Sequence, residues 1–159
     1  KIRFVEKAGD DGEIFDAAGL KVGVYFFTQA INEVEAVEEA SMVLGLIKNY
    51  KISYPVFLDV ESSGGRADGL DSNTRTKIIK AFCETIENSG YTAGIYANKS
   101  WFEKKMDVSQ LTKYKIWLAQ YAAAPTYSKS KVDLWQYKST GKVSGISGNV
   151  DLNISYLGY

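Results

Sequence analysis

Residues 55–63 read Pro55-Val56-Phe57-Leu58-Asp59-Val60-Glu61-Ser62-Ser63. The apolar run 56–58 has the composition of a strand that is buried on both faces, and it stops at two carboxylates separated by one residue. Successive residues of a strand point to opposite faces, so Asp59 and Glu61 share a face with Cβ atoms roughly 6.5 Å apart. The stretch therefore predicts a buried strand that presents a pair of acids at its carboxyl end.

The segments on either side of this strand alternate between strand and helix patterns. The predicted strands cover residues 2–5, 22–27, 55–60, 91–97, 115–121, 132–137 and 150–153. The predicted helices cover residues 14–18, 32–49, 71–89 and 100–105. The early strands are separated by enough residues for a helix and two loops, which indicates parallel β-α-β units, whereas the closer spacing of the last strands suggests antiparallel pairing. We expect an α/β fold in a single domain, residues 1–159, without a linker.

Composition excludes several classes of function. Lysines and arginines number 19 and so do aspartates and glutamates, so the chain has no basic field for nucleic acid. It contains one cysteine, Cys83, and no histidine, which removes disulfides, Cys/His zinc sites and histidine-based triads. No apolar run approaches the ~20 residues of a membrane span, so membrane insertion is not expected. Acid–base chemistry is left to carboxylates, tyrosines or lysines.

The acid pair has three interpretations. Two neighbouring carboxylates disfavour each other's ionisation, and partial burial adds to this effect, so one can stay protonated as a general acid, as in glycosidases. The pair can equally be an ordinary polar end of a strand. It can also hold Mg²⁺ or Ca²⁺, although no other acidic cluster has the spacing of a metal loop, so we expect no metal and no cofactor.

Aromatic and amide side chains gather at the ends of the other strands. Each group alone fits core packing, but next to an acid pair they can line a groove for sugar rings. Tyr96 fits either a substrate hydrogen bond or a hydroxyl directed to water. The residues concerned are Tyr25, Phe26, Phe27, Trp117, Gln120, Tyr121, Trp135, Gln136 and Tyr137.

Six motifs in a fixed order carry a resemblance to a known family. They are Gly23-Val24-Tyr25-Phe26-Phe27, Pro55 to Glu61, Gly90-Tyr91-Thr92-Ala93-Gly94-Ile95-Tyr96, Trp117-Leu118-Ala119-Gln120-Tyr121, Leu134-Trp135-Gln136-Tyr137 and Val150-Asp151-Leu152-Asn153. In this order the chain resembles glycoside hydrolase family 25, the lysozymes or N-acetylmuramidases, over about residues 19–159. The resemblance implies an irregular TIM-like β/α barrel.

The resemblance also implies a reaction and roles for residues. The expected reaction is hydrolysis of the β-1,4 bond between N-acetylmuramic acid and N-acetylglucosamine in peptidoglycan, with retention and participation of the substrate's N-acetyl group, without a cofactor. Glu61 is implied as the general acid, Asp59 as its charged partner and Asp151 as a further acidic residue. The implied partner is the peptidoglycan glycan strand, and the implied location is extracellular or the cell wall. The implied substrate-binding residues are Tyr25, Phe27, Tyr96, Trp117, Gln120, Tyr121, Trp135 and Gln136.

The amino-terminal part of the sequence departs from the family pattern. The family opens with a strand of Ile-Asp-Val-Ser type, which residues 1–20 do not match, and barrels of this type commonly need ~200 residues or more. We therefore expect a barrel that is incomplete at its amino terminus. Two alternatives follow: a catalytically incomplete barrel that binds glycan without cutting it, and a chitinase-like glycosidase.

Overall fold

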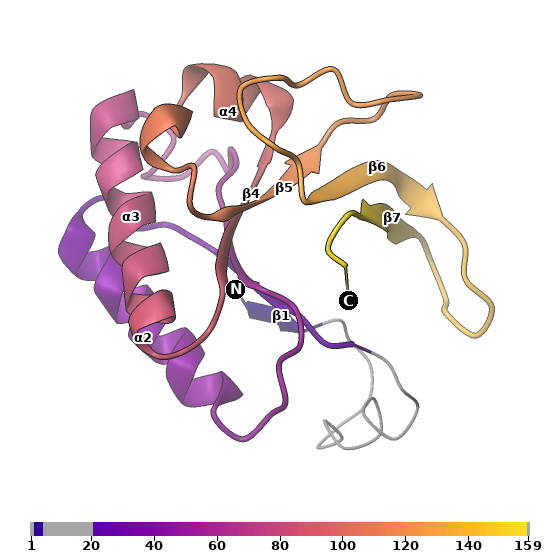
Figure 1. The fold of residues 1–159 in the computed structure, drawn as a ribbon, viewed down its shortest axis with the longest axis horizontal. Coiled ribbons are helices and arrows are strands. Elements are labelled where there is room, and N and C mark those ends of the chain that lie inside the picture. Colours follow the sequence, from indigo (N-terminus) through magenta and orange to yellow (C-terminus); the bar gives the residue numbers. More distant parts are fainter. Residues whose placement is uncertain (1, 5–20, 159) are drawn as a thin grey trace.

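The computed structural model describes residues 2–4 and 21–158, which form a curled mixed sheet with helices along one face (Figure 1). Within these residues the sheet has seven strands, and their spatial order follows the chain. The strands are β1 (Ile2–Phe4), β2 (Val24–Phe27), β3 (Val56–Asp59), β4 (Ala93–Asn98), β5 (Lys115–Ala119), β6 (Leu134–Gly141) and β7 (Val150–Ser155). The helices are α2 (Glu33–Ile47), α3 (Ser72–Asn88), α4 (Lys99–Lys104) and the short 3-10 helix η1 (Val108–Gln110).

The strand directions confirm most of the predicted topology. Strands β2 to β6 are parallel, whereas β1 is antiparallel to β2 and β7 is antiparallel to β6. The prediction of antiparallel pairing is right for β6–β7 and wrong for β5–β6. Residues 120–133 contain no helix, yet they are long enough to return the chain to the start of the next strand. The predicted helix at 14–18 lies outside the described residues.

Capping residues mark the starts of helices α2 and α3 and the end of α3. Asn32 Oδ1 accepts a hydrogen bond of 2.9 Å from the Glu35 amide at the start of α2, as expected of the Asn32–Glu35 pair. Asp71 caps α3 by accepting from two backbone amides. At the other end of α3, Gly90 has a φ of +88°, a left-handed conformation that costs glycine little. Local chemistry thus fixes the start of α2 and both ends of α3.

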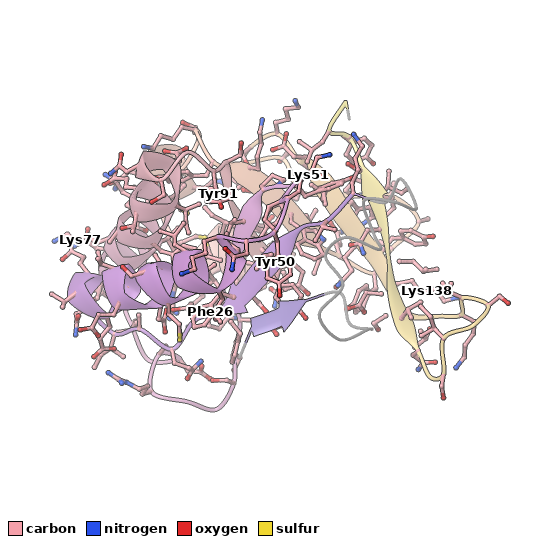
Figure 2. All side chains as sticks on the ribbon, turned by 90° about the horizontal axis from the view of Figure 1, so that it is seen from below. Phe26, Tyr50, Lys51, Lys77, Tyr91 and Lys138 are labelled. Atoms are coloured by element: carbon pink, nitrogen blue, oxygen red, sulfur yellow. The ribbon has the colours of Figure 1, made fainter. Side chains whose placement is uncertain are left out.

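The hydrophobic core lies between the sheet and helices α2 and α3. Alternate strand residues such as Phe26, Leu58 and Ile95 point into it, and the Phe26 ring stacks on Phe82 of α3 with centroids 6.3 Å apart. Seen from below, Lys77 on the helical side and Lys138 on β6 lie at opposite ends of the molecule (Figure 2). The opposite set of strand residues faces away from the helices, and this inner face carries the candidate site.

None of the helices in the described part of the chain combines the length and apolar character needed to cross a membrane.

Candidate active site

One residue from each of four neighbouring strands contributes to a row across the inner face of the sheet. In the strand register, Phe27 of β2 pairs with Asp59 of β3, Asp59 with Tyr96 of β4, and Tyr96 with Trp117 of β5. The backbone ladder continues beyond Asp59, because the Val60 amide donates to the Tyr96 carbonyl at 2.9 Å. Parallel strands in register therefore align these four side chains near their carboxyl ends.

A pocket of about 280 Å³ opens over this row. We call it the acidic pocket, and it is lined by Tyr25, Phe27, Asp59, Glu61, Tyr96, Trp117, Gln136 and Asp151. All eight belong to the set of candidate residues predicted from the sequence. The structure therefore brings together side chains that are up to 126 positions apart in the chain, as between Tyr25 and Asp151.

Asp59 is the buried member of the acid pair. The residue is only 6% exposed, and its Oδ1 atom has no hydrogen-bond partner among the described residues. Burial, followed by the charge of Glu61, raises the pKa of Asp59 to about 8. A carboxyl group in these surroundings is largely protonated at neutral pH, because ionisation would leave an uncompensated charge out of water.

Glu61 and Asp151 lie at the exposed edge of the acidic pocket. Partial burial, followed by the negative charge of Asp151, raises the pKa of Glu61 above its ordinary value. Asp59 sits on a strand, whereas Glu61 is two residues beyond the end of β3, at the start of a loop. The three acids therefore differ in their environment: one is buried, and two face solvent.

Trp117 lies at the centre of an aromatic cluster on the floor of the acidic pocket. Its ring makes edge contacts with Tyr25, Phe57 and Tyr96, with centroid distances of 6.1, 5.2 and 4.9 Å. Its indole nitrogen donates a hydrogen bond of 2.8 Å to Asn153 Oδ1 on β7. This arrangement fixes a half-buried aromatic surface beside the acids, of a kind that suits the apolar faces of sugar rings.

Gln136 links two tyrosines above this cluster. Its Oε1 atom accepts hydrogen bonds of 2.9 Å from the hydroxyl groups of both Tyr96 and Tyr121. Burial, with the nearby charge of Glu61 next, raises the pKa of Tyr96 far above its ordinary value. The Tyr96 hydroxyl is therefore a neutral donor whose direction is set by Gln136.

A second pocket, of about 420 Å³, adjoins the first and shares Glu61 and Tyr96 with it. We call it the side pocket, and it is lined by Glu61, Tyr96, Asn98, Lys99, Ser100, Ala119 and Tyr121. Tyr121, a predicted substrate-binding residue, belongs to this pocket. The sequence analysis did not single out Asn98 and Lys99, which lie between the predicted strand 91–97 and the predicted helix 100–105, or Ser100, which was only the start of that helix.

Gln120 and Trp135 lie outside the linings of both pockets. Trp135 points to the helix side of the sheet, where it is 5% exposed, and its indole nitrogen donates to the Gln120 carbonyl at 2.8 Å. The Gln120 side chain instead bonds Thr126 in the loop after β5. Both residues support neighbouring elements, because alternation along a strand directs only every second side chain inward.

The loop that follows Glu61 is fixed at several points. Asp68 accepts hydrogen bonds from Ser62, Ser63 and Gly64. The Nη2 atom of Arg66 forms an ion pair with both carboxylate oxygens of Glu35 on α2. The Nη2 atom of the buried Arg75 donates to the three carbonyls of residues 67, 68 and 70. A charged residue that sequence reasoning did not single out, Arg75, thus holds the loop that begins at Glu61.

Among the described residues, no three acidic or cysteine side chains are grouped as ligands for a metal ion.

Comparison with known proteins identifies the family. The sequence profile of "Glycosyl hydrolases family 25" matches residues 10–146. The autolytic lysozyme of Clostridium acetobutylicum is 28% identical over 138 residues, which make up 86% of this chain and 40% of that protein.

Solved structures share the fold. The modular autolysin LytC from Streptococcus pneumoniae, solved with a synthetic peptidoglycan ligand, matches with a TM-score of 0.76 and 30% identity over 91% of this chain and 36% of LytC. The CTP1L endolysin matches with a TM-score of 0.75 and 26% identity over 91% of this chain and 50% of that chain. The chain thus spans half or less of the length of each of these three relatives. The profile covers most of the sequence, including the first five of the six motifs, and confirms the resemblance: the chain belongs to glycosyl hydrolases family 25.

Proposed function

We propose that this chain is a lysozyme that hydrolyses the β-1,4 bond between N-acetylmuramic acid and N-acetylglucosamine in peptidoglycan. The observation that carries the proposal is the placement of buried Asp59 and exposed Glu61 in one pocket with Asp151, beside the aromatic surface of Trp117. Family membership supports it, as do the names of the relatives, one an autolytic lysozyme and one an autolysin solved with a peptidoglycan ligand.

Glu61 acts as the general acid in this proposal. Its raised pKa lets it keep a proton to higher pH than an ordinary glutamate does, and its exposed position at the boundary of two pockets gives a glycosidic oxygen access to that proton. Departure of the protonated leaving group breaks the bond to the sugar's anomeric carbon, and the substrate's N-acetyl oxygen attacks that carbon. Water then opens the resulting ring, so the configuration is retained.

Asp59 is the partner that responds to charge on the sugar. In the free pocket its pKa of about 8 favours the protonated form. Positive charge that develops on the sugar or on its N-acetyl group lowers this pKa, because opposite charges favour ionisation. The Asp59 carboxyl therefore releases its proton to solvent through the open pocket as this charge develops, and the carboxylate left behind stabilises the charge. Asp151, across the acidic pocket, keeps the pKa of Glu61 raised and positions substrate or water.

The same proposal extends to the domain and its location. We infer that residues 1–159 act as one catalytic domain with the architecture of an irregular TIM-like barrel, working outside the cell or at the cell wall. The chain-order arrangement of strands and the parallel run from β2 to β6 support this architecture.

The proposal is tested with purified cell walls. Wild-type chain should release reducing ends, and Glu61→Gln should reduce the rate by roughly 10²–10⁴-fold, the usual contribution of a general acid. Glu38→Gln, an exposed change on α2, serves as the control and should leave the rate unaltered. Undiminished release by Glu61→Gln would remove Glu61 as the acid.

Two other outcomes separate the alternatives. Binding of cell-wall glycan by the wild-type chain without any turnover would favour a glycan-binding barrel. Cleavage of chitin oligomers but not of walls would favour a chitinase-like glycosidase.

A further inference from the structure

The side pocket is placed to receive a part of the substrate. Because Glu61 lines both pockets, a glycosidic oxygen that it protonates lies at their junction, and the groups joined by that oxygen extend into both. The acidic pocket takes the ring that reacts. The side pocket, of about 420 Å³, has room for a further ring or for a large substituent.

The charges of the two pockets are different. Asp59, Glu61 and Asp151 line the acidic pocket, whose described lining contains no cation. Lys99 lines the side pocket and is the one cation among the described residues of either lining. An anionic group on the substrate is therefore repelled from the acidic pocket and attracted toward the side pocket.

Lys99 is held in place by its surroundings. Its Nζ atom donates to Thr126 Oγ1 at 2.8 Å and lies 3.7 Å from Glu103 Oε1. Thr126 is itself fixed by two hydrogen bonds with the Gln120 side chain, of 2.7 and 3.0 Å. An ammonium group has three N–H donors, so these two partners leave at least one for a ligand. The side chain is about one-third exposed, which leaves it open to the pocket.

The other residues of the side pocket add neutral contacts. Asn98 Oδ1 accepts from the Trp101 amide at 3.0 Å, which leaves the Asn98 amino group as a donor. Tyr121 is 60% exposed, and its hydroxyl is oriented by Gln136, so its ring offers an apolar surface. A cation, an amide donor and an aromatic ring together suit a carboxylate attached to a carbon framework.

We propose that the side pocket binds a carboxylate carried on the O3 substituent of a muramic acid residue, with Lys99 as its cationic partner. The carboxylate belongs either to the free lactyl group or to the peptide attached to it, and the contact is the same ionic one in both cases. This inference rests on the proposed lysozyme function. It makes Lys99 a determinant of specificity for substituted strands over uncharged glycans, and it sets the direction in which the strand lies across Glu61.

The experiment compares substrates that differ only in charge. Soluble peptidoglycan tetrasaccharides with intact peptides are prepared alongside the same molecules whose carboxylates are converted to carboxamides. A second pair, stripped of peptide by an amidase, carries only the lactyl carboxylate or its carboxamide. For each pair, KM and kcat are measured from the release of reducing ends, at low and high salt.

Wild-type chain should have a roughly fivefold lower KM for the carboxylate form, the size expected of one partly exposed ion pair, and the preference should shrink in high salt. Lys99→Met should abolish the preference, because the KM of the carboxylate form should rise to that of the carboxamide. Lys99→Arg should retain part of it. Lys104→Met, an exposed change on the same helix, should retain all of it, and Glu103→Gln should enlarge it by freeing the Lys99 ammonium.

Each outcome has a defined meaning. A preference in the stripped pair assigns the lactyl carboxylate, and a preference confined to the first pair assigns the peptide. Equal KM values for the wild-type chain, or a preference that survives Lys99→Met, would overturn the inference while the lysozyme function stands. If the wild-type chain cleaves no substrate, the proposed function fails. In that case calorimetry measures the affinity of the wild-type chain and of Lys99→Met for the same substrate pairs. Tighter binding of the carboxylate form that is lost in Lys99→Met supports the inference about the side pocket, and equal affinities overturn it.

Discussion

The aromatic ring of Phe57 on β3 lies over Gly94 on β4, its partner in the strand register. A β-carbon at position 94 would overlap ring atoms Cδ1 and Cε1 of Phe57 and would also come within 3.0 Å of the Lys115 carbonyl. The Phe57 ring in turn meets the Trp117 ring edge-on at a centroid distance of 5.2 Å. The missing side chain of Gly94 therefore sets the position of the aromatic surface in the acidic pocket.

Gly94→Ala should destabilise the protein by about 1–3 kcal/mol, because the added methyl group has no space and Phe57 must move. The displaced ring should also tilt Trp117 and weaken saccharide binding. Urea unfolding and tryptophan fluorescence measure the two effects. Gly45→Ala, at an exposed position of α2 with nothing nearby, should instead stabilise by ~1 kcal/mol. Equal stability of Gly94→Ala and the parent would contradict the packing argument.

Asp59→Asn should change how stability depends on pH. The pKa of Asp59 rises from 3.8 to about 8 on folding, so the native state binds a proton that the unfolded state releases, and stability falls as the pH rises through this window. Asparagine stays neutral at every pH, so the unfolding free energy of the variant lacks this fall with rising pH. The variant should match the parent near pH 3.5 and exceed it by about 2–5 kcal/mol near pH 8, at ~1.4 kcal/mol per pKa unit. Parallel stability curves in chemical denaturation would refute the raised pKa.

Arg75→Met should destabilise the protein by about 2–4 kcal/mol, since three carbonyls lose their donor and the cation–π contact with Trp101, at 4.5 Å, is lost. The loop that begins at Glu61 should loosen, which lowers kcat more than it changes KM. Arg75→Lys should rescue little, because the lysine ammonium ends one bond short of the Nη2 position and has no planar group to lie over the Trp101 ring. Lys77→Met, an exposed change on the same helix (Figure 2), is the control and should alter neither quantity. Full activity and stability of Arg75→Met would show that the loop is held by its other contacts.

Tyr96 and Gln136 should behave as an energetic unit. Gln136→Leu leaves the partly buried Tyr96 hydroxyl without its acceptor, and Tyr96→Phe removes that hydroxyl. Each change alone should cost about 1–2 kcal/mol, and the double variant should cost less than the sum by ~1 kcal/mol. The measurement is a double-mutant cycle, in which the unfolding free energies of the parent, the two single variants and the double variant are determined by thermal or urea unfolding. Strict additivity would mean that the 2.9 Å bond contributes nothing to stability.

The sequence predicts the elements well because their signals are local. The apolar run of β3, the Asn32 and Asp71 caps and the glycine at position 90 each act within a few residues. The same local logic applies to the row of site residues, since alternation and a parallel arrangement put Asp59, Tyr96 and Trp117 on one face.

Features that depend on register or on distant contacts are not predictable in this way. The sequence alone does not show which of the neighbours Trp135 and Gln136 has its side chain in the acidic pocket. Only the pairing of β6 with β5 decides this. The position of Lys99 depends on Thr126, which is 27 residues away in the chain. A strand glycine does signal a close approach, and this signal at Gly94 is the one that could have revealed the ring of Phe57.

The row of Phe27, Asp59, Tyr96 and Trp117 takes one side chain from each of four strands, and three separate crossovers join those strands. No single β-α unit carries the row, so neither one nascent β-α unit nor a proteolytic fragment of that size could have a working site. Catalytic competence arises only when the whole parallel sheet has assembled. The rate at which activity returns during refolding therefore reports directly the rate at which the whole sheet assembles.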